Sequence, residues 1–149
     1  MKLFAAAAIA AFSATGAAYA CPDSSAWGAT YSATGSDLYI PQSYFVTAGG
    51  SNSLTACGFV ETGYVTSAPD FTFDLSRMQG YRLEVRVVSD CDAALLVNGP
   101  NGSWYYDDDS NGNSDPRINL SSVRSGYLDV WVGTYNGAYC NATLTLESF

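Results

Sequence analysis

The clearest strand pattern in this chain of 149 residues runs Tyr81-Arg82-Leu83-Glu84-Val85-Arg86-Val87-Val88-Ser89. Apolar side chains occupy every second position from Tyr81 to Val87, and charged side chains stand between them. Successive side chains of a strand point to opposite faces of the sheet. The alternation therefore predicts a strand with one buried face and one solvated face.

Two segments near the end of the chain repeat this one-sided pattern. Leu128, Val130 and Val132 share one face of a predicted strand, and this aliphatic face is the better candidate for the core. The opposite row of that strand is Tyr127, Asp129, Trp131, Gly133 and Tyr135. The final strand sets Ala142, Leu144 and Leu146 against polar residues.

Shorter strands are predicted where apolar runs lie between turn-forming residues. These runs are Ser43–Thr47, Phe71–Leu75, Ala93–Asn98, Trp104–Tyr106 and Arg117–Leu120. No segment shows a convincing helical period, and we interpret residues 21–69 as further strands of the same domain. Many short strands at this spacing indicate an all-β fold, an antiparallel β-sandwich.

The first twenty residues have the features of a secretion signal. A charged start at Lys2 precedes an apolar run, and small residues end at Ala20 before Cys21. The run is too short for a transmembrane anchor, which needs about 20 apolar residues. We expect residues 1–20 to be removed and residues 21–149 to form a single domain, secreted or periplasmic. Lipidation of Cys21 is the alternative interpretation.

Four cysteines lie in the exported part, where an oxidising compartment favours disulfides. Of the three possible connectivities we favour Cys21–Cys57 with Cys91–Cys140, because the second pair joins a strand end to the start of the last strand. A zinc site is disfavoured, since no two cysteines are near in sequence and the chain has no histidine.

Composition argues against familiar catalysis. The chain has no histidine, and Lys2 is its only lysine. A Ser-His-Asp triad, a Cys-His pair, a Ser-Lys dyad or a lysine Schiff base therefore cannot be assembled from residues 21–149. The net charge is −8 with no basic cluster, which makes nucleic acid an improbable partner.

One part of the chain resembles a known family. The runs Cys91–Trp104 and Gly126–Tyr135, with an acidic stretch between them, look like the bacterial pre-peptidase C-terminal domain. That pattern places an aspartate before an apolar strand, then a Pro-x-Gly turn, and a Gly-x-Tyr strand near the end, over roughly residues 70–149. The resemblance implies a small jelly-roll-like sandwich of a kind commonly appended to secreted peptidases, so that a stand-alone chain of this type can carry a serine-peptidase name. This chain departs from such an enzyme because it has no histidine for a catalytic triad, and a peptidase name would describe only an association.

The acidic stretch, Asp107 to Asp115, is the sharpest chemical signal. Oxygen-bearing residues alternate along it, and Gly112 stands at the sixth position, as in the first half of a calcium loop. The predicted ligands are Asp107, Asp109, Asn111, Asn113 and Asp115. The match fails at the twelfth position, where Ile118 replaces a bidentate glutamate. A solvated turn without metal is the alternative, because Asp, Asn, Ser and Gly dominate turns.

Aromatic side chains form a second candidate site. The predicted ligand-binding residues are Trp104, Tyr106, Trp131 and Tyr135. Planar rings exposed in a row stack on sugars or hold an extended polypeptide, and collagen-binding relatives of the resembled family present exposed tyrosines. Packing is the competing explanation, because aromatic residues suit pleated surfaces.

Together these features predict a secreted, noncatalytic binding or accessory module, stabilised by calcium in one version of the hypothesis and associated with extracellular peptidases. Its expected partner is a secreted or envelope protein or a polysaccharide. Two alternatives remain open: a carboxylate-based secreted hydrolase, and a structural component of the cell envelope.

Overall fold

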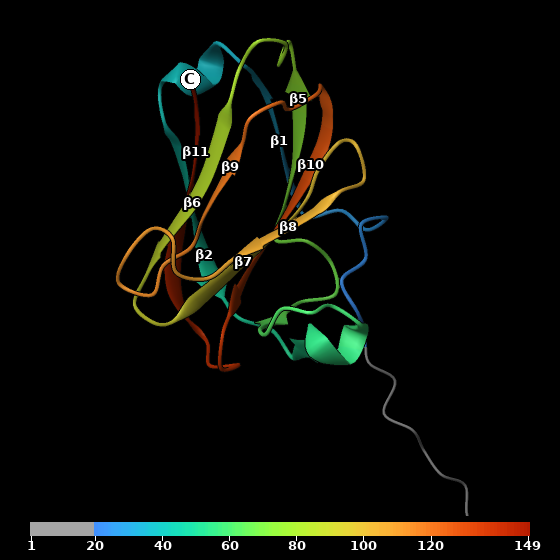
Figure 1. Ribbon diagram of the computed structural model, residues 1–149, viewed down its shortest axis with the longest axis vertical. Coiled ribbons are helices and arrows are strands. Elements are labelled where there is room, and N and C mark those ends of the chain that lie inside the picture. The colour runs from blue at the N-terminus through green and yellow to red at the C-terminus, as the bar shows by residue number, and fades with distance from the viewer. Residues whose placement is uncertain (1–19) are drawn as a thin grey trace, which may run out of the picture.

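The computed structural model describes residues 20–149, so the predicted signal peptide lies outside the described residues except for Ala20. The described chain is built almost wholly from strands, packed as two layers (Figure 1). In chain order the elements are β1 (Ala29–Thr34), η1 (Asp37–Tyr39), β2 (Gln42–Ala48), β3 (Asn52–Ser53), η2 (Thr55–Cys57), β4 (Tyr64–Val65), β5 (Phe71–Ser76), β6 (Leu83–Ser89), β7 (Ala93–Asn98), β8 (Trp104–Asp107), β9 (Arg117–Leu120), β10 (Gly126–Thr134) and β11 (Cys140–Ser148). None of the helices in residues 20–149 has the length and apolar character needed to cross a membrane.

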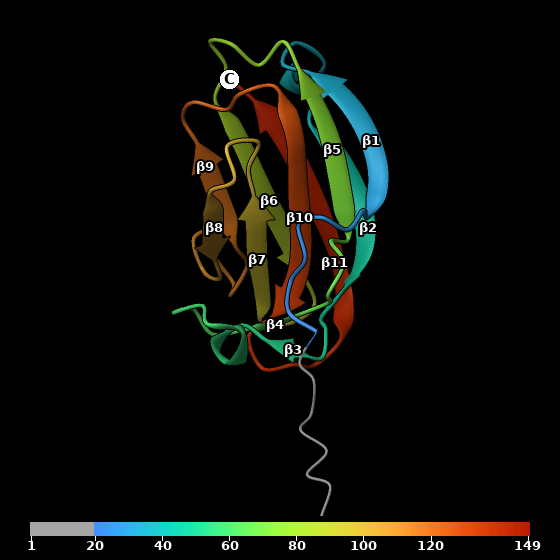
Figure 2. The same ribbon diagram turned by 90° about the vertical axis from the view of Figure 1, so that its right-hand side faces the viewer.

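The two sheets define a β-sandwich, which confirms the predicted fold class. One sheet has the order β1-β5-β10-β4-β3, with β7 on the other edge of β10 and β8 beside β7. The second sheet has the order β2-β11-β6-β9. In Figure 2 the edge strands β1 and β2 lie on one side of the sandwich, and β8 and β9 lie on the other.

The predicted strands from β5 onward are confirmed, with ends that shift by a few residues. The predicted strand Ser43–Thr47 is confirmed as β2. The rest of residues 21–69, interpreted only as further strands, contains β1, β3, β4 and two short 3-10 helices. One pairing departs from an antiparallel sandwich, because β1 runs parallel to β5 from Ala29 opposite Phe71 to Thr34 opposite Ser76.

The main core lies between the inner faces of the two sheets. Leu83, Val85 and Val87 of β6 are at most 1% exposed and belong to one buried cluster with the aliphatic row of β10. That row is Leu128, Val130 and Val132, so the predicted core face of β10 is confirmed. Burying such side chains is worth about 1.5–3 kcal/mol each.

A second, smaller cluster lies on the outer face of the first sheet. Leu54 and Val65, from the segment that contains β3 and β4, pack over Leu96 and Trp131. Gly133 allows this segment to approach closely, because a Cβ there would stand 2.4 Å from the carbonyl oxygen of Tyr64. The segment therefore covers part of the outer face of the sheet.

Both disulfides are present in the pairing that the sequence favours. Cys21–Cys57 joins the start of the described chain to η2, and Cys91–Cys140 joins the end of β6 to the start of β11. The described residues contain no free cysteine. Two disulfides fit a protein that folds in an oxidising compartment, extracellular or periplasmic.

Candidate functional site

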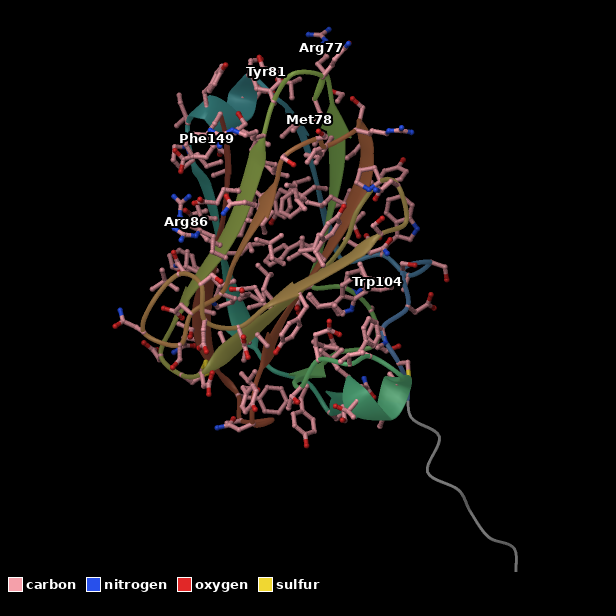
Figure 3. All side chains as sticks on the ribbon, in the orientation of Figure 1. Arg77, Met78, Tyr81, Arg86, Trp104 and Phe149 are labelled. Carbon is pink, nitrogen blue, oxygen red and sulfur yellow. A yellow bond between two sulfur atoms is a disulfide. The ribbon has the colours of Figure 1, made fainter. Side chains whose placement is uncertain are left out.

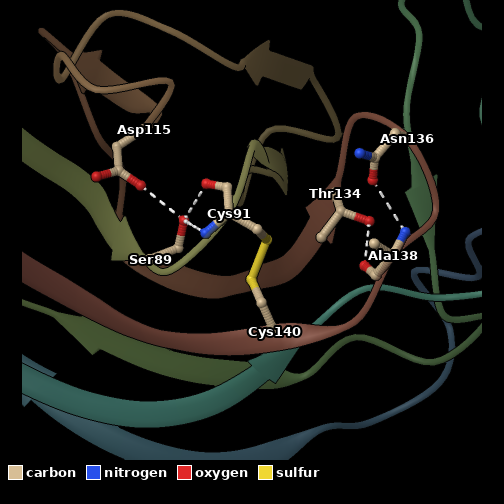
Figure 4. The surroundings of a disulfide bond; sticks show 7 residues. All are labelled: Ser89, Cys91, Asp115, Thr134, Asn136, Ala138 and Cys140. Carbon is tan, nitrogen blue, oxygen red and sulfur yellow. Dashed lines mark hydrogen bonds between the residues drawn. A yellow bond between two sulfur atoms is a disulfide. The ribbon is translucent and has the colours of Figure 1, made fainter.

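Three loops meet at one end of the sandwich around Cys91–Cys140 (Figure 4). The backbone amide of Ala93 donates to the carbonyl of Ser114 over 3.1 Å, and the amide of Tyr135 donates to the carbonyl of Asp92 over 2.9 Å. These bonds tie the turn after β6 to the acidic loop and to the loop after β10. The disulfide and the backbone bonds together fix the side chains that project from this end.

A pocket of about 260 Å³ opens where these loops meet. Its lining, which we call the acidic pocket, is Asp92, Asp108, Asp109, Ser114 and Tyr135. Every side chain in this set carries an oxygen, and three of the five are carboxylates. The acidic pocket is therefore a concave surface suited to a positively charged group.

The negative charge of the acidic pocket is not neutralised by neighbouring arginines. Among residues 20–149 the salt bridges are those of Arg86 with Glu84 and Glu147, on the outer face of the second sheet. The arginine nearest in sequence, Arg117, directs its Nη2 to the carbonyl of Ser110 over 2.8 Å. The carboxylates of the pocket thus have no ionic partner within the described chain.

The pKa of Asp108 reflects this crowding. Burial raises the pKa of the Asp108 carboxyl, and the nearby carboxylates, led by Asp109, raise it further. The hydroxyl of Tyr106 acts in the opposite direction, at 3.4 Å from Asp108 Oδ2. Clustered carboxylates repel one another, so a bound cation would lower their mutual repulsion.

The five predicted calcium ligands have separate positions. Asp107 organises its own loop, because its Oδ2 accepts from the amides of Ser110 at 2.9 Å and Arg117 at 2.8 Å. Asn111 donates to the carbonyl of Val87 at 2.9 Å. Asp109 alone of the five lines the acidic pocket.

The other two predicted ligands also have structural positions. Asp115 is 4% exposed, and its Oδ1 lies 2.8 Å from the hydroxyl of Ser89. Asn113 is exposed and adopts a left-handed backbone with φ 55°. No three His, Cys, Asp or Glu side chains of residues 20–149 form a group that could hold a metal ion. The described loop is held by hydrogen bonds within itself and to β6.

The aromatic prediction is wrong for Trp131. This side chain lies on the predicted outer face of β10, yet it is 0% exposed, because the segment of Leu54 and Val65 covers it. Its indole N–H donates to the carbonyl of Ser67 over 3.3 Å. The cause is tertiary, since a segment distant in sequence converts an outer face into an interior. Trp131 is therefore a packing residue.

The remaining aromatic candidates do not form one row. Trp104 is 37% exposed, and the centroid of its ring lies 5.3 Å from the ring centroid of Trp131. Tyr106 is partly buried, and its hydroxyl lies within hydrogen-bond distance of two acceptors, the carbonyl of Thr62 and, at 3.4 Å, Asp108 Oδ2. Tyr135 is 43% exposed and lines the acidic pocket. Figure 3 shows Trp104 on the side of the sandwich opposite Arg86.

Three residues of the acidic pocket were not predicted from the sequence: Asp92, Asp108 and Ser114. The position of Asp92 could have been predicted from the favoured Cys91–Cys140 disulfide, because this bond brings Asp92 next to the loop that carries Tyr135. The position of Asp108 could not be read in this way, since it depends on how the acidic loop turns back between β8 and β9.

Comparisons with known proteins place the chain by its fold. No protein-family model matches the sequence, and no curated protein matches it either. Among solved structures, the chain is similar to PliG from Aeromonas hydrophila, a periplasmic lysozyme inhibitor of g-type lysozyme, with 11% identity, a TM-score of 0.50, and coverage of 83% of this chain and 98% of that one. It is also similar to the pre-peptidase C-terminal domain of collagenase from Bacillus anthracis, with 10% identity, a TM-score of 0.49, and coverage of 80% and 96%. At these identities the likeness concerns the fold alone.

Proposed function

We propose that this protein is an exported, noncatalytic binding module that recognises a cationic group on a protein partner. In this proposal residues 1–20 are the signal peptide, residues 21–149 form one domain, and the partner is another secreted or envelope protein. The acidic pocket is the proposed contact site.

The acidic pocket is the observation that carries the proposal. Asp92, Asp108 and Asp109 converge on one hollow without an arginine partner in the described chain. A guanidinium or ammonium group entering it would form charge-assisted hydrogen bonds with these carboxylates. The hydroxyls of Ser114 and Tyr135 supply further acceptors, so the pocket offers both charge and directional hydrogen bonding.

Calcium is a second, weaker proposed occupant of the same pocket, although its three carboxylates are not grouped closely enough in the described structure to hold one metal ion together. All five lining side chains present oxygen, the atom type that Ca²⁺ prefers. Calcium takes six to eight oxygen ligands, and Asp109 is the one predicted ligand that lines the hollow. We therefore expect weak calcium binding that raises the melting temperature at millimolar concentration and competes with an organic cation.

A noncatalytic role is supported by the residue types available. Residues 21–149 contain neither histidine nor lysine, so proton transfer would rest on carboxylates. The Asp108 cluster favours one competing function, carboxylate-based hydrolysis of a glycan or peptide. Sustained turnover by the purified protein that D108N abolishes would establish that alternative and overturn the noncatalytic proposal.

The similarity in fold to PliG supports a protein as the partner in this proposal. PliG is an inhibitor of g-type lysozyme, so a sandwich of similar fold acts there on another protein. An association with secreted peptidases remains the expectation raised by the resemblance of residues 70–149.

The test measures binding of a fluorescently labelled oligo-arginine peptide by anisotropy, with an oligo-serine peptide as the neutral control. We expect D109N to weaken oligo-arginine binding several-fold, because it removes one carboxylate of the pocket. The matched control is D74N, which removes an exposed carboxylate on β5. We expect D74N to bind like the wild type.

Equal weakening by D109N and D74N would mean that only net charge matters, and it would contradict a pocket-specific site. Calcium forms the second arm: millimolar CaCl₂ added to chelator-treated protein should raise the melting temperature of D74N but not that of D109N. The peptide arm and the calcium arm fail separately, so the two proposed occupants are distinguished.

A further inference from the structure

The edge strands β1 and β2, on one side of the sandwich, contain no charged residue. Between Asp23 and Glu61 the sequence has a single charged residue, Asp37. The Oδ2 atom of Asp37 accepts hydrogen bonds from the backbone amide of Thr34 at 2.9 Å and from its hydroxyl at 2.6 Å. Both edge strands on this side, β1 and β2, lie within the uncharged stretch (Figure 2).

The β2 strand is an open edge. It pairs with β11 and with no other strand of the described chain. Natural edge strands are commonly protected by charged side chains, proline or bulges. From Gln42 to Ala48 the sequence QSYFVTA contains neither charge nor proline, and its seven pairs with β11 run without a bulge. By contrast, the edge strand β9 contains Arg117.

Large apolar side chains are exposed along the same edge. Phe45 is 91% exposed at the centre of β2, and Ile40, just before the strand, is 72% exposed. In the other layer Tyr31 of β1 is 41% exposed, and its ring centroid lies 4.5 Å from that of Tyr44 on β2. Aromatic side chains therefore line both faces of this edge, which we call the β1–β2 margin: Phe45 faces outward, and Tyr44 packs inward against Tyr31 and the core.

We propose that this margin is a homodimer interface, in which β2 pairs antiparallel with β2 of a second copy and the second sheet continues from one molecule into the other. The occupant follows from charge. Two copies with a net charge of −8 each repel over most of their surfaces, and the β1–β2 margin is where they can meet without opposing charges.

The sequence of β2 also fits a twofold axis. With Phe45 of each copy at the axis, Phe45 faces its own counterpart, and Ser43 lies opposite Thr47 of the second copy. The flanking pair joins Tyr44 to Val46 of the second copy. Aromatic and β-branched neighbours of this kind stabilise paired strands. The acidic residue beside β2 on the outer face of this sheet is Glu147 of β11, next to the start of β2, and it forms a salt bridge of 2.7 Å with Arg86.

Sedimentation velocity over a range of concentrations tests the interface. We expect the wild type to sediment as a dimer at high concentration and F45K to remain a monomer, because two ammonium groups would stand opposite each other. F45K also reduces the net negative charge, so a purely electrostatic effect would favour association instead. The matched control is V60K, at a residue that is 94% exposed and lies outside β2, and it should dimerise like the wild type.

A wild type that stays monomeric throughout, an F45K variant that dimerises normally, or a V60K variant that fails to dimerise would overturn the proposal. The register has its own test. The double variant S43E/T47K places opposite charges across the twofold axis, so its dimer should strengthen at low salt and weaken at high salt. A salt response identical to that of the wild type would overturn the antiparallel register. None of these substitutions touches the acidic pocket, so the interface and the proposed function can fail independently.

Discussion

The carboxylate Oδ2 of Asp70 accepts a hydrogen bond of 2.7 Å from the backbone amide of Val132. Asp70 lies immediately before β5, and its side chain satisfies a backbone donor of β10 beyond the end of the β5 ladder. Burial raises the pKa of the Asp70 carboxyl to about 6, and the hydrogen bond from Val132 lowers it by a smaller amount. Asp70 should therefore make the stability of the protein depend on pH.

The direction of this pH dependence follows from the linkage between proton binding and folding. The folded pKa of Asp70 is higher than its ordinary value of 3.8, so the folded protein binds this proton more tightly than the unfolded chain does. Its favourable contribution is complete below pH 3.8 and is lost as pH rises toward 6. Because one pKa unit corresponds to 1.36 kcal/mol, the ionised carboxylate costs up to about 3 kcal/mol at neutral pH.

We predict that D70N increases the free energy of unfolding at pH 7 by about 1–3 kcal/mol, with the gain shrinking toward pH 4. The amide keeps an oxygen that accepts from Val132 and removes the charge. Urea unfolding at several pH values measures the effect, and D74N at an exposed position of β5 is the control. A pH-independent difference between D70N and the wild type would contradict this account.

Trp131 should behave as the centre of an interior cluster. We predict that W131A lowers the free energy of unfolding by about 3–5 kcal/mol, because it leaves a large cavity beside Leu54 and Leu96. In a variant with Trp131 as its sole tryptophan, acrylamide should quench the fluorescence weakly. The matching variant that retains only Trp27, which is 57% exposed, should be quenched strongly. Equal quenching in the two variants would show that the covering segment does not exclude water.

The contrast between β10 and residues 50–70 shows what could be predicted from the sequence. Alternation in β10 identified Leu128, Val130 and Val132 as the core face, because a sheet buries one face by its own geometry. The burial of Trp131 on the opposite face depends on a long-range contact with Leu54, which has no local pattern. Local periodicity therefore predicts which residues share a face, while the cover over that face depends on tertiary packing.

The same distinction applies to the candidate site. The residue types of the acidic loop predicted affinity for cations, and Asp109 does line the acidic pocket. The calcium-loop spacing could not show that Asp107 would bond to its own loop or that Asp115 would turn toward Ser89. Turn-forming aspartates satisfy nearby backbone amides as readily as they bind metals, and sequence spacing is similar in the two cases.

Arg86 bridges two carboxylates on the outer face of the second sheet. Its Nη1 lies 2.6 Å from Glu84 Oε1 and 2.7 Å from Glu147 Oε2, and these two glutamates are direct cross-strand neighbours. We predict that R86M lowers the free energy of unfolding by about 2 kcal/mol at pH 7, because it leaves two like charges opposite each other. The triple variant R86M/E84Q/E147Q should recover most of the loss. The control is R124M, at an exposed arginine without a salt bridge in the described chain. Equal destabilisation by R124M would rule out a specific role for the group formed by Arg86, Glu84 and Glu147.

Removal of the two disulfides should have different effects on the solvent exposure of Trp131. The disulfides close loops with sequence separations of 36 and 49, so the loss of either should cost about 4 kcal/mol in the chain-entropy model.

Cys57 lies in η2, next to the Leu54 that covers Trp131. In the background with Trp131 as sole tryptophan, C21S/C57S should therefore increase acrylamide quenching under native conditions. C91S/C140S should lower the melting temperature without that increase, because Cys91–Cys140 joins β6 to β11 in the other sheet. The prediction is wrong if C91S/C140S increases native-state quenching as much as C21S/C57S does.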